Sequence, residues 1–307
     1  MADKHRDLYQ EVTTKILAAL EKGTPPWHKP WAAGGVGGFF PVRHNGQPYN
    51  GVNVMLLWIA QDTNGYTNNR WMTFKQAVEY GGMVRKGEHG EMVVYLGRST
   101  KTEVNPKTNE DEVKTFSFLK FSTVFNVEQI DGLPERFYGK PAINNPLNER
   151  IEAVEGFVGN TKAEIQHGGN QAFYVPSKDF IKVPEIKTFE DTESYYATVL
   201  HELTHWTQHK SRLNREFGRA RWGDEGYAAE ELVAELGAAF LCAQLEISLT
   251  PRPDHAAYLA NWAKVLRDDK KAIFTAASHA TKACEFLNKL QPQSETATET
   301  ETEEAAQ

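Results

Sequence analysis

The sequence predicts an α+β protein with two domains followed by a disordered acidic tail. The chain has 307 residues, which is enough for two domains that each bury a core. Helical and strand-like segments are mixed in its first part, whereas helical periodicity dominates its second part. Residues 132–146 between them are rich in Pro, Gly and Asn, as domain linkers are. We therefore expect a first domain over residues 1–135, a second over residues 147–290 and a disordered tail over residues 291–307.

Helical segments come first in the first domain. Apolar residues share one helical face over residues 8–21, and a glycine and two prolines follow closely. Residues 52–59 are mostly apolar, and their periodicity alone fits a helix or a strand. Residues 73–80 fit a short helix that a glycine pair ends.

Two strands complete the first domain. Residues 92–96 and 115–124 have strand composition. The polar stretch between them, residues 97–113, is expected to form a long hairpin loop. This mixture of elements makes the first domain α+β.

The second domain is expected to be mainly helical, with two short strands. The expected helices cover residues 148–160, 192–209, 229–241 and a long region over 256–290, and the expected strands cover residues 172–175 and 180–183.

The most informative segment for function is His201-Glu202-Leu203-Thr204-His205, inside an expected helix. Positions four apart share one face of a helix, so both imidazoles can point at one metal ion. The carboxylate of Glu202 then lies beside that ion, where it can take a proton from an attacking water molecule. The spacing therefore predicts half of a zinc site and a general base.

A third protein ligand is expected from the next helix. Leu232, Leu236 and Phe240 trace an apolar stripe there, so carboxylates beside the stripe point into the protein, where a metal can balance their charge. Glu231 and Glu235 are four apart and share a face. One of them can bind the metal while the other accepts a hydrogen bond from a ligand histidine, and the spacing leaves open which does which.

The combined motif resembles that of the gluzincin metallopeptidases, in which a second helix supplies ExxxD or ExxxE after HExxH. The resemblance implies that His201, His205 and Glu231 bind Zn²⁺, or another divalent ion such as Mn²⁺. It also implies that Glu202 is the general base and that Glu235 orients a ligand from outside the first shell. Gluzincins usually have Asp where this chain has Glu235, so the choice between Glu231 and Glu235 as ligand stays open.

Charge and apolar content limit the classes of protein. The net charge of −7 divides unevenly, with 15 Lys and Arg against 13 Asp and Glu over residues 1–130 and 19 against 28 in the remainder. The acidic segment over residues 294–307 has no large apolar residue, so it cannot bury enough surface to fold. No apolar run reaches the ~18 residues of a membrane span, and only Cys242 and Cys284 are present. We expect a cytoplasmic protein without a membrane partner or a disulfide framework.

The first domain interleaves aromatic and basic residues. Such mixtures hold single-stranded nucleic acid, because bases stack on rings while cations follow the phosphates. The excess of basic residues is small, however, and several of the aromatics are needed for a core, so the composition alone fits a plain folded domain equally well. The residues that we expect to contact DNA are Arg43, Arg70, Trp71, Lys75, Arg85 and Lys86.

Three blocks of the first domain resemble the N-terminal domain of ArdC antirestriction proteins, which mobile elements carry. They are Tyr49-Asn50-Gly51-Val52-Asn53, Trp71-Met72-Thr73-Phe74-Lys75-Gln76-Ala77 and residues 82–90. The second domain of that family is matched at residues 201–207 and 230–235. The resemblance covers about residues 8–290. It implies a single-stranded-DNA-binding first domain, a metallopeptidase domain similar to SprT-type proteases, and protection of incoming plasmid DNA from restriction.

Three functions compete for this combination. The first is a DNA-binding protein whose zinc peptidase acts on a restriction enzyme or another DNA-bound protein, with residues 180–183 as the strand edge that holds the substrate. The second is a protective single-stranded-DNA-binding protein whose metal site is structural or idle. Glu202 favours the first, because a structural site needs no carboxylate there. A metal-dependent nuclease is disfavoured, because two-metal nucleases prefer clusters of carboxylates.

Overall fold

The structure is a computed structural model that describes residues 6–22, 25, 27, 38–104, 111–139, 147–217, 225–247 and 255–292. Its elements are α1 (Leu8–Leu20), β1 (Val42–Arg43), α2 (Val52–Asn64), β2 (Arg70–Thr73), α3 (Phe74–Glu79), β3 (Met83–Val84), β4 (Glu91–Val104), β5 (Asp111–Asn126), η1 (Val127–Gln129), β6 (Ile130–Asp131), α4 (Glu135–Tyr138), α5 (Leu147–Asn160), β7 (Glu164–His167), β8 (Phe173–Val175), β9 (Phe180–Val183), η2 (Ile186–Thr188), α6 (Thr192–Trp206), α7 (Glu225–Gln244), α8 (His255–Asp268) and α9 (Ala272–Lys289). Of the disordered tail expected over residues 291–307, residues 293–307 lie outside the described residues. The start expected at residue 291 is wrong, because the side chain of Gln291 donates hydrogen bonds to the C=O groups of Phe157 and Leu287, at 3.2 and 3.0 Å.

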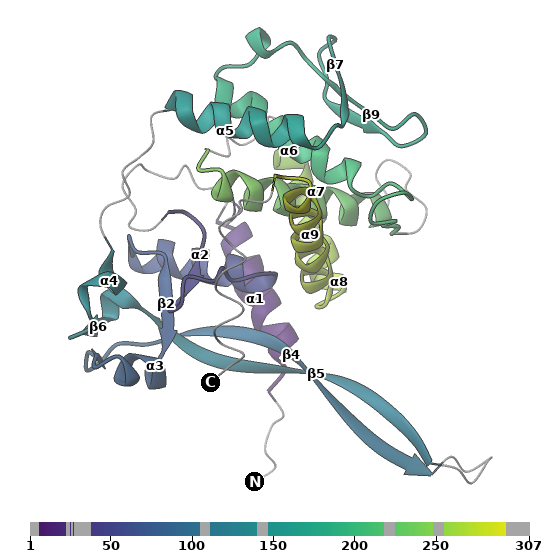
Figure 1. Ribbon diagram of the computed structural model, residues 1–307. Helices are drawn as coiled ribbons and strands as arrows, with labels where there is room; N and C mark the ends of the chain where they lie inside the picture. Colours follow the sequence, from purple (N-terminus) through teal and green to yellow (C-terminus); the bar gives the residue numbers. More distant parts are fainter. Residues whose placement is uncertain are drawn as a thin grey trace.

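The N-terminal region combines α1 and α2 with a four-stranded sheet (Figure 1). The strand order is β1-β2-β5-β4, in which β1 is parallel to β2 and β5 is antiparallel to both of its neighbours. Residues 52–59, whose type the sequence left open, belong to the helix α2. The predicted short helix is α3, which begins at a capping box formed by Thr73 and Gln76.

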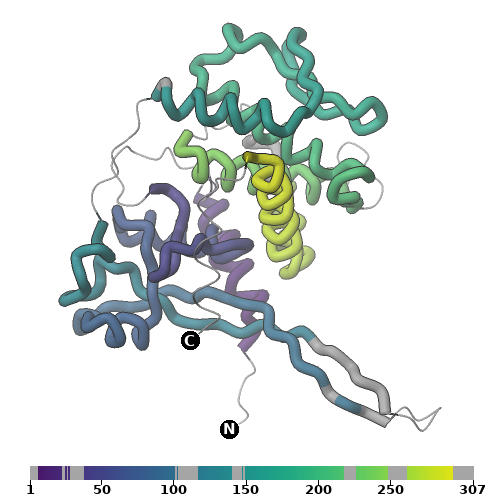
Figure 2. The backbone as a smooth tube through the Cα atoms, viewed as in Figure 1, coloured from purple at the N-terminus to yellow at the C-terminus, as the bar shows by residue number. Residues whose placement is uncertain are grey.

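Strands β4 and β5 are longer than expected and form a two-stranded ribbon. They pair from Glu91↔Val124 to Val104↔Asp111. The prediction of a hairpin loop over residues 97–113 is therefore wrong outside residues 105–110, which the structure does not describe. Polar residues are compatible with such a ribbon because the backbone supplies the ladder of hydrogen bonds. Figures 1 and 2 show the ribbon extending away from the rest of the protein.

The C-terminal region combines helices α5 to α9 with a three-stranded sheet of order β7-β9-β8. Strand β9 is parallel to β7 and antiparallel to β8, so both of its edges are paired. The expectation that residues 180–183 offer an open edge to a substrate is therefore wrong. Strand β7 was not expected because its sequence is mainly polar. The long helix expected over residues 256–290 is divided into α8 and α9.

A continuous hydrophobic core joins the two regions. Phe240 of α7 packs against Trp58 of α2 and against Phe40, with ring centroids 5.9 and 6.0 Å apart. The N–H of Gly51 donates a hydrogen bond to Oγ1 of Thr281 in α9 at 3.0 Å. Helix α2 therefore packs directly on α7, the helix that bears the acidic motif, while the domain limits at residues 135 and 147 stay a prediction.

The remaining expectations about the whole chain concern membranes and cysteines. Among the helices in the described ranges, none is long and apolar enough to cross a membrane. Cys242 and Cys284 are both buried and free, in agreement with the absence of a disulfide framework, and burial raises the pKa of both thiols.

Candidate metal centre

The candidate metal ligands lie where helices α6 and α7 cross. Helix α6 begins after Asp191, whose side chain accepts a hydrogen bond from the N–H of Ser194 at 2.7 Å, and its residues from Tyr195 to its end are buried. Helix α7 lies close against it at Gly237, where a Cβ atom would lie 2.5 Å from Cγ2 of Thr204. Because glycine allows this approach, the histidines of α6 and the glutamates of α7 can reach one another.

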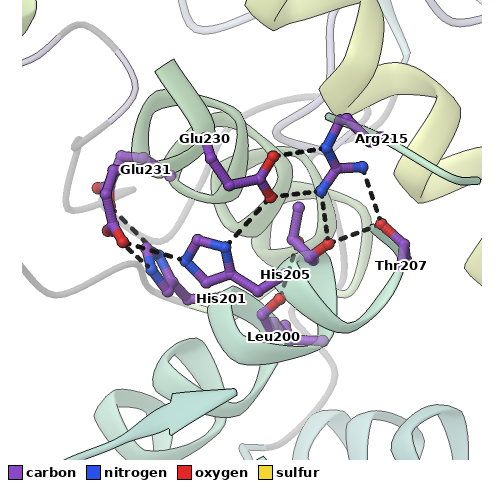
Figure 3. Close-up of polar contacts among 9 residues, drawn as sticks. Leu200, His201, His205, Thr207, Arg215, Glu230 and Glu231 are labelled. Atoms are coloured by element: carbon purple, nitrogen blue, oxygen red, sulfur yellow. Dashed lines mark hydrogen bonds and ion pairs between the residues drawn. The ribbon is translucent and has the colours of Figure 1, made fainter. Parts of the chain in front are cut away.

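His201, His205 and Glu231 form a compact set of three donors (Figure 3). Nε2 of His201 lies 3.6 Å from Oε2 of Glu231, and Nε2 of His205 lies 3.5 Å from Oε1 of Glu231. One ligand atom from each residue falls within 4.8 Å of the others. A tetrahedral ion with bonds of about 2.0–2.1 Å separates its ligand atoms by about 3.3 Å. The observed separations and the nitrogen and oxygen donors therefore fit zinc or a similar divalent ion.

Carboxylates contact the other ring nitrogen of both histidines. Nδ1 of His201 lies 3.5 Å from Oε2 of Glu235, and Nδ1 of His205 lies 3.2 Å from Oε1 of Glu230. Such carboxylates orient an imidazole and make its metal-facing nitrogen more basic. The geometry thus places Glu231 on the Nε2 side and Glu235 on the Nδ1 side, which supports Glu231 as the third ligand, although that assignment stays a prediction.

Sequence reasoning missed Glu230 and Arg215. The guanidinium of Arg215 donates to both carboxylate oxygens of Glu230, at 2.8 and 2.6 Å. It also donates to Oγ1 of Thr207 at 3.1 Å and to the C=O of Thr204 at 3.0 Å. Its side chain is 1% exposed, so these bonds satisfy a charge inside the protein. Glu230 could have been predicted, because it directly precedes Glu231 in the acidic motif. Arg215 could not, because it lies in the loop after α6, where no regular spacing predicts which residues meet.

The charges of this cluster shift the pKa values of its members. Burial lowers the pKa of His205, but the charges of Glu231 and Glu230 outweigh burial and raise it above its usual range. Burial raises the pKa of Glu231, but the two histidines outweigh burial and hold it well below its usual range. Burial is likewise outweighed at Glu230, whose pKa is lowered mainly by the hydrogen bonds from Arg215. A bound divalent ion would take the place of the proton that balances these carboxylates.

Glu202 follows His201 on α6 and is 2% exposed. It lies between the two histidines in the sequence of α6, the position from which we expect a general base to act on a bound water. Its catalytic role stays a prediction.

The residues expected to contact DNA are distributed over β1, β2, α3 and the loop after β3. Trp71 is fully buried and packs edge-on against Tyr66, with ring centroids 5.7 Å apart. This burial contradicts its expected contact with DNA, because a ring must be exposed to stack on a base. Trp71 is a core residue of the N-terminal region.

The basic residues of that group differ in how freely they present their charge. Arg85 forms ion pairs with Glu88 at 2.7 Å and with Asp131 at 3.3 Å, and Arg70 donates to a backbone C=O at 2.8 Å. Arg85 is nevertheless exposed, as are Arg43, Lys75 and Lys86. Lys75 keeps 86% of its side-chain surface exposed at 3.7 Å from Glu79, and the guanidinium carbon of Arg43 lies 5.3 Å from the centroid of the Tyr49 ring. Arg43, Lys75 and Lys86 are better placed for phosphates than Arg85, whose charge is held by two close ion pairs, and all of these contacts stay predictions.

The two regions match known families separately. Residues 6–125 match the N-terminal domain of the anti-restriction factor ArdC, and residues 152–279 match the zincin-like metallopeptidases. The fold and the donor set thus define a zincin-like metallopeptidase domain that follows an ArdC-type N-terminal domain. The chain belongs to the ArdC family of antirestriction proteins.

Relatives with solved structures have the same architecture. The antirestriction ArdC protein from plasmid R388 is 42% identical in its metal-free crystal structure, with a TM-score of 0.76, and 41% identical in its Mn(II)-bound structure, with a TM-score of 0.72. Each comparison covers 93% of this chain and 98% of the R388 chain.

Two curated relatives extend the comparison. The uncharacterized protein y4eC of Sinorhizobium fredii (strain NBRC 101917 / NGR234) is 38% identical over 291 residues, which are 93% of this chain and 92% of y4eC. The DNA primase TraC of Escherichia coli is 39% identical over 308 residues, which cover 94% of this chain but only 27% of TraC. This chain therefore corresponds to a minor part of the primase.

Proposed function

We propose that this antirestriction protein binds single-stranded DNA through its N-terminal region and cleaves DNA-associated proteins with a zinc-dependent peptidase site. The observation that carries the proposal is the donor set of His201, His205 and Glu231, with Glu202 beside it on the same helix. A purely structural metal site needs no carboxylate in that position. The family's antirestriction role supports DNA as a partner.

The protein residues would divide the catalytic work. Zinc at the three donors would supply a Lewis acid that polarises a peptide carbonyl and acidifies water. Glu202 would take the proton of the attacking water and deliver it to the nitrogen of the departing peptide. Glu235 and Glu230 would hold the two imidazoles in orientation through their Nδ1 atoms.

Zinc is the first candidate metal, because two imidazoles and one carboxylate with tetrahedral spacing are a common catalytic zinc set. Manganese is the alternative, since the R388 ArdC protein has been solved with Mn(II). Elemental analysis of protein purified without added metal separates the two: a stoichiometric amount of zinc supports the first, and manganese in its place overturns it.

An extended substrate would pair with β8 in place of β9. Both edges of β9 are already paired, whereas β8 is an outer strand of the described sheet and packs against α6. Phe173 at the start of β8 is 44% exposed and would contact the side chains of such a peptide. The open edge of β8 thus gives the peptidase site a place to hold a backbone.

The proposal is tested by incubating the protein with a restriction endonuclease, a single-stranded oligonucleotide and either metal. Wild type should cleave the endonuclease, and Glu202→Gln should be about 10²–10⁴-fold slower while it keeps its metal and its DNA binding. Equal cleavage by Glu202→Gln would contradict the assigned base. A metal-loaded, DNA-bound wild type that cleaves nothing would favour a protective single-stranded-DNA-binding protein with an idle metal site.

A further inference from the structure

The middle of the β4–β5 ribbon concentrates positive charge and aromatic rings. Residues 95–101 and 114–121 contain four basic residues, four aromatic residues and no acid. The basic residues are Arg98, Lys101, Lys114 and Lys120, and the aromatic ones are Tyr95, Phe116, Phe118 and Phe121. The acids Glu103, Glu110, Asp111 and Glu112 lie between these two stretches in the sequence, so the nearly balanced charge of the whole N-terminal region conceals this separation.

The strand register assigns several of these residues to one face. Tyr95 and Lys120 are Cα partners, and Phe118 is two positions from Lys120, so all three share a face of the ribbon. Further along, the register pairs the backbones of Lys101 and Lys114. We refer to Tyr95, Phe118 and Lys120 as the ribbon platform.

A glycine opposite Phe118 makes room for its ring. Gly97 is the Cα partner of Phe118, and a Cβ atom on Gly97 would lie 2.5 Å from Cε2 and 2.6 Å from Cζ of that ring. The ring therefore lies across the bare backbone of Gly97, which covers one ring face. Nζ of Lys120 lies 5.0 Å from the ring centroid. Sequence and register together thus hold an aromatic ring in a fixed position on this face.

The remaining members of the platform are open to solvent. Tyr95 is 50% exposed, and Lys120 is exposed. A cation over an aromatic ring at an exposed site is held weakly, so Lys120 can move to a phosphate when a base takes the ring face. Two rings and a weakly held cation on one face of the ribbon match what single-stranded nucleic acid requires, namely stacking surfaces and a charge that follows the backbone.

The opposite face of the ribbon has a different character. Leu96, which is 56% exposed, and its Cα partner Leu119 lie there, together with Phe121. The guanidinium of Arg6 covers the Phe121 ring at 4.5 Å from its centroid. The exposed Arg98, two positions from Leu96, lies on this face as well. Leu96 and Leu119, together with the cover of Phe121 by the N-terminal segment, distinguish this face from the platform, so the two faces can be tested against each other.

We propose that the ribbon platform is a stacking site for the bases of single-stranded DNA, in which Tyr95 and Phe118 contact bases and Lys120 contacts a phosphate. The site rests on the proposed function, because it presupposes that the protein binds single strands. Its residues differ from the six that the sequence predicts to contact DNA.

The test uses the full-length protein and two labelled strands of equal length, an oligothymidylate and an abasic strand that has the phosphates but no bases. Tyr95→Ala and Gly97→Ala should weaken binding of the oligothymidylate by about 5- to 150-fold, the loss expected for one stacked base, and should barely affect the abasic strand. Gly97→Ala is informative because Gly97 is not among the positive-φ glycines, so Ala fits the backbone and only displaces the ring. Lys120→Ala should weaken binding of both strands.

Leu96→Ala is the matched control, since it removes an exposed side chain from the opposite face of the same strand. It should bind both strands as wild type does, and thermal unfolding should show that all variants are folded. If wild type binds no oligothymidylate, the proposed function itself fails. If wild type binds while Tyr95→Ala and Gly97→Ala bind equally well, or lose affinity for both strands to the same extent, the platform is overturned and the proposed function stands.

Discussion

The metal-ligand cluster and the ribbon platform hold their functional groups in opposite surroundings. His201 and Glu231 are 3% and 8% exposed between two crossing helices, whereas Tyr95 is 50% exposed on a ribbon that extends away from the protein. A buried charge must have a partner, so the residue types in a buried helical motif already limit what they can do. Water can hydrogen-bond to exposed polar groups, so the residue types on an exposed surface do not by themselves indicate which partner they bind.

This difference explains why helical spacing predicted the metal-ligand cluster, whereas composition did not predict which residues of the N-terminal region are exposed. Helical spacing placed both histidines and the acids of the next helix together, as the structure does. The aromatic and basic composition of the N-terminal region could not separate the buried Trp71 from the exposed Tyr95, because only tertiary packing decides which aromatic forms the core.

The largest effect is expected from the metal ligands. His201→Ala should remove the metal. The loss of metal affinity should exceed the roughly 10–100-fold loss that is expected when a residue that only hydrogen-bonds to a ligand is removed. Binding of single-stranded DNA should be unchanged, because the two sites are separate. Elemental analysis and oligonucleotide titration of the same preparation check both points. A full equivalent of metal retained after His201→Ala would contradict the site.

Trp71→Ala is expected to act on stability. The side chain is fully buried, so its removal should lower the free energy of unfolding by about 3–5 kcal/mol through lost burial and the cavity left behind. Chemical denaturation measures this. A folded variant of unchanged stability that no longer binds DNA would restore Trp71 as a nucleic-acid contact and would weaken the contrast between the two regions.

Glu230→Gln should have an intermediate effect on the metal. The substitution keeps the shape but removes the charge that Arg215 and His205 share, so metal affinity should fall by about 10–100-fold. Competition with a fluorescent chelator measures the change, and Glu190→Gln, an exposed glutamate outside α6, is the control. Unchanged affinity would mean that Glu230 only pairs with Arg215.

The smallest effect concerns single cations on the surface. Lys86 is exposed, so Lys86→Ala should reduce the slope of log affinity against log salt for a single strand by about 0.7, the contribution of one phosphate contact. Arg85→Ala should change the slope less, because its charge is already paired with Glu88 and Asp131. The opposite order would show that Arg85 leaves its acidic partners when DNA binds.

Much of the fold was predictable, and the exceptions have physical causes. The type of α2 could not be read from periodicity because Val54, Met55, Leu56 and Leu57 are all buried, which leaves no polar face to set the period. The extent of β4 and β5 was underestimated because backbone pairing continues through polar residues whose composition resembles a loop. The edge expected at β9 was wrong because the polar strand β7 pairs with it.

The residues of the candidate site also fall into those that the sequence predicts and those that only the structure shows. His201, Glu202 and His205 follow from one helical motif, and the acids of α7 from a second. Arg215 could not be found, because its contact with Glu230 depends on the path of a loop after α6. Local periodicity therefore predicts ligands, while the residues that fix those ligands from neighbouring loops require the structure.

The most direct test of the account is plasmid transfer into recipients that carry a restriction enzyme, comparing wild type, Glu202→Gln and Glu190→Gln. The account assigns Glu202 the proton transfer in peptide cleavage, so Glu202→Gln should lose protection, while Glu190→Gln should protect as wild type does. Parallel assays should show that Glu202→Gln still binds metal and single-stranded DNA. Full protection by Glu202→Gln would contradict the account, because antirestriction would then require no peptidase chemistry.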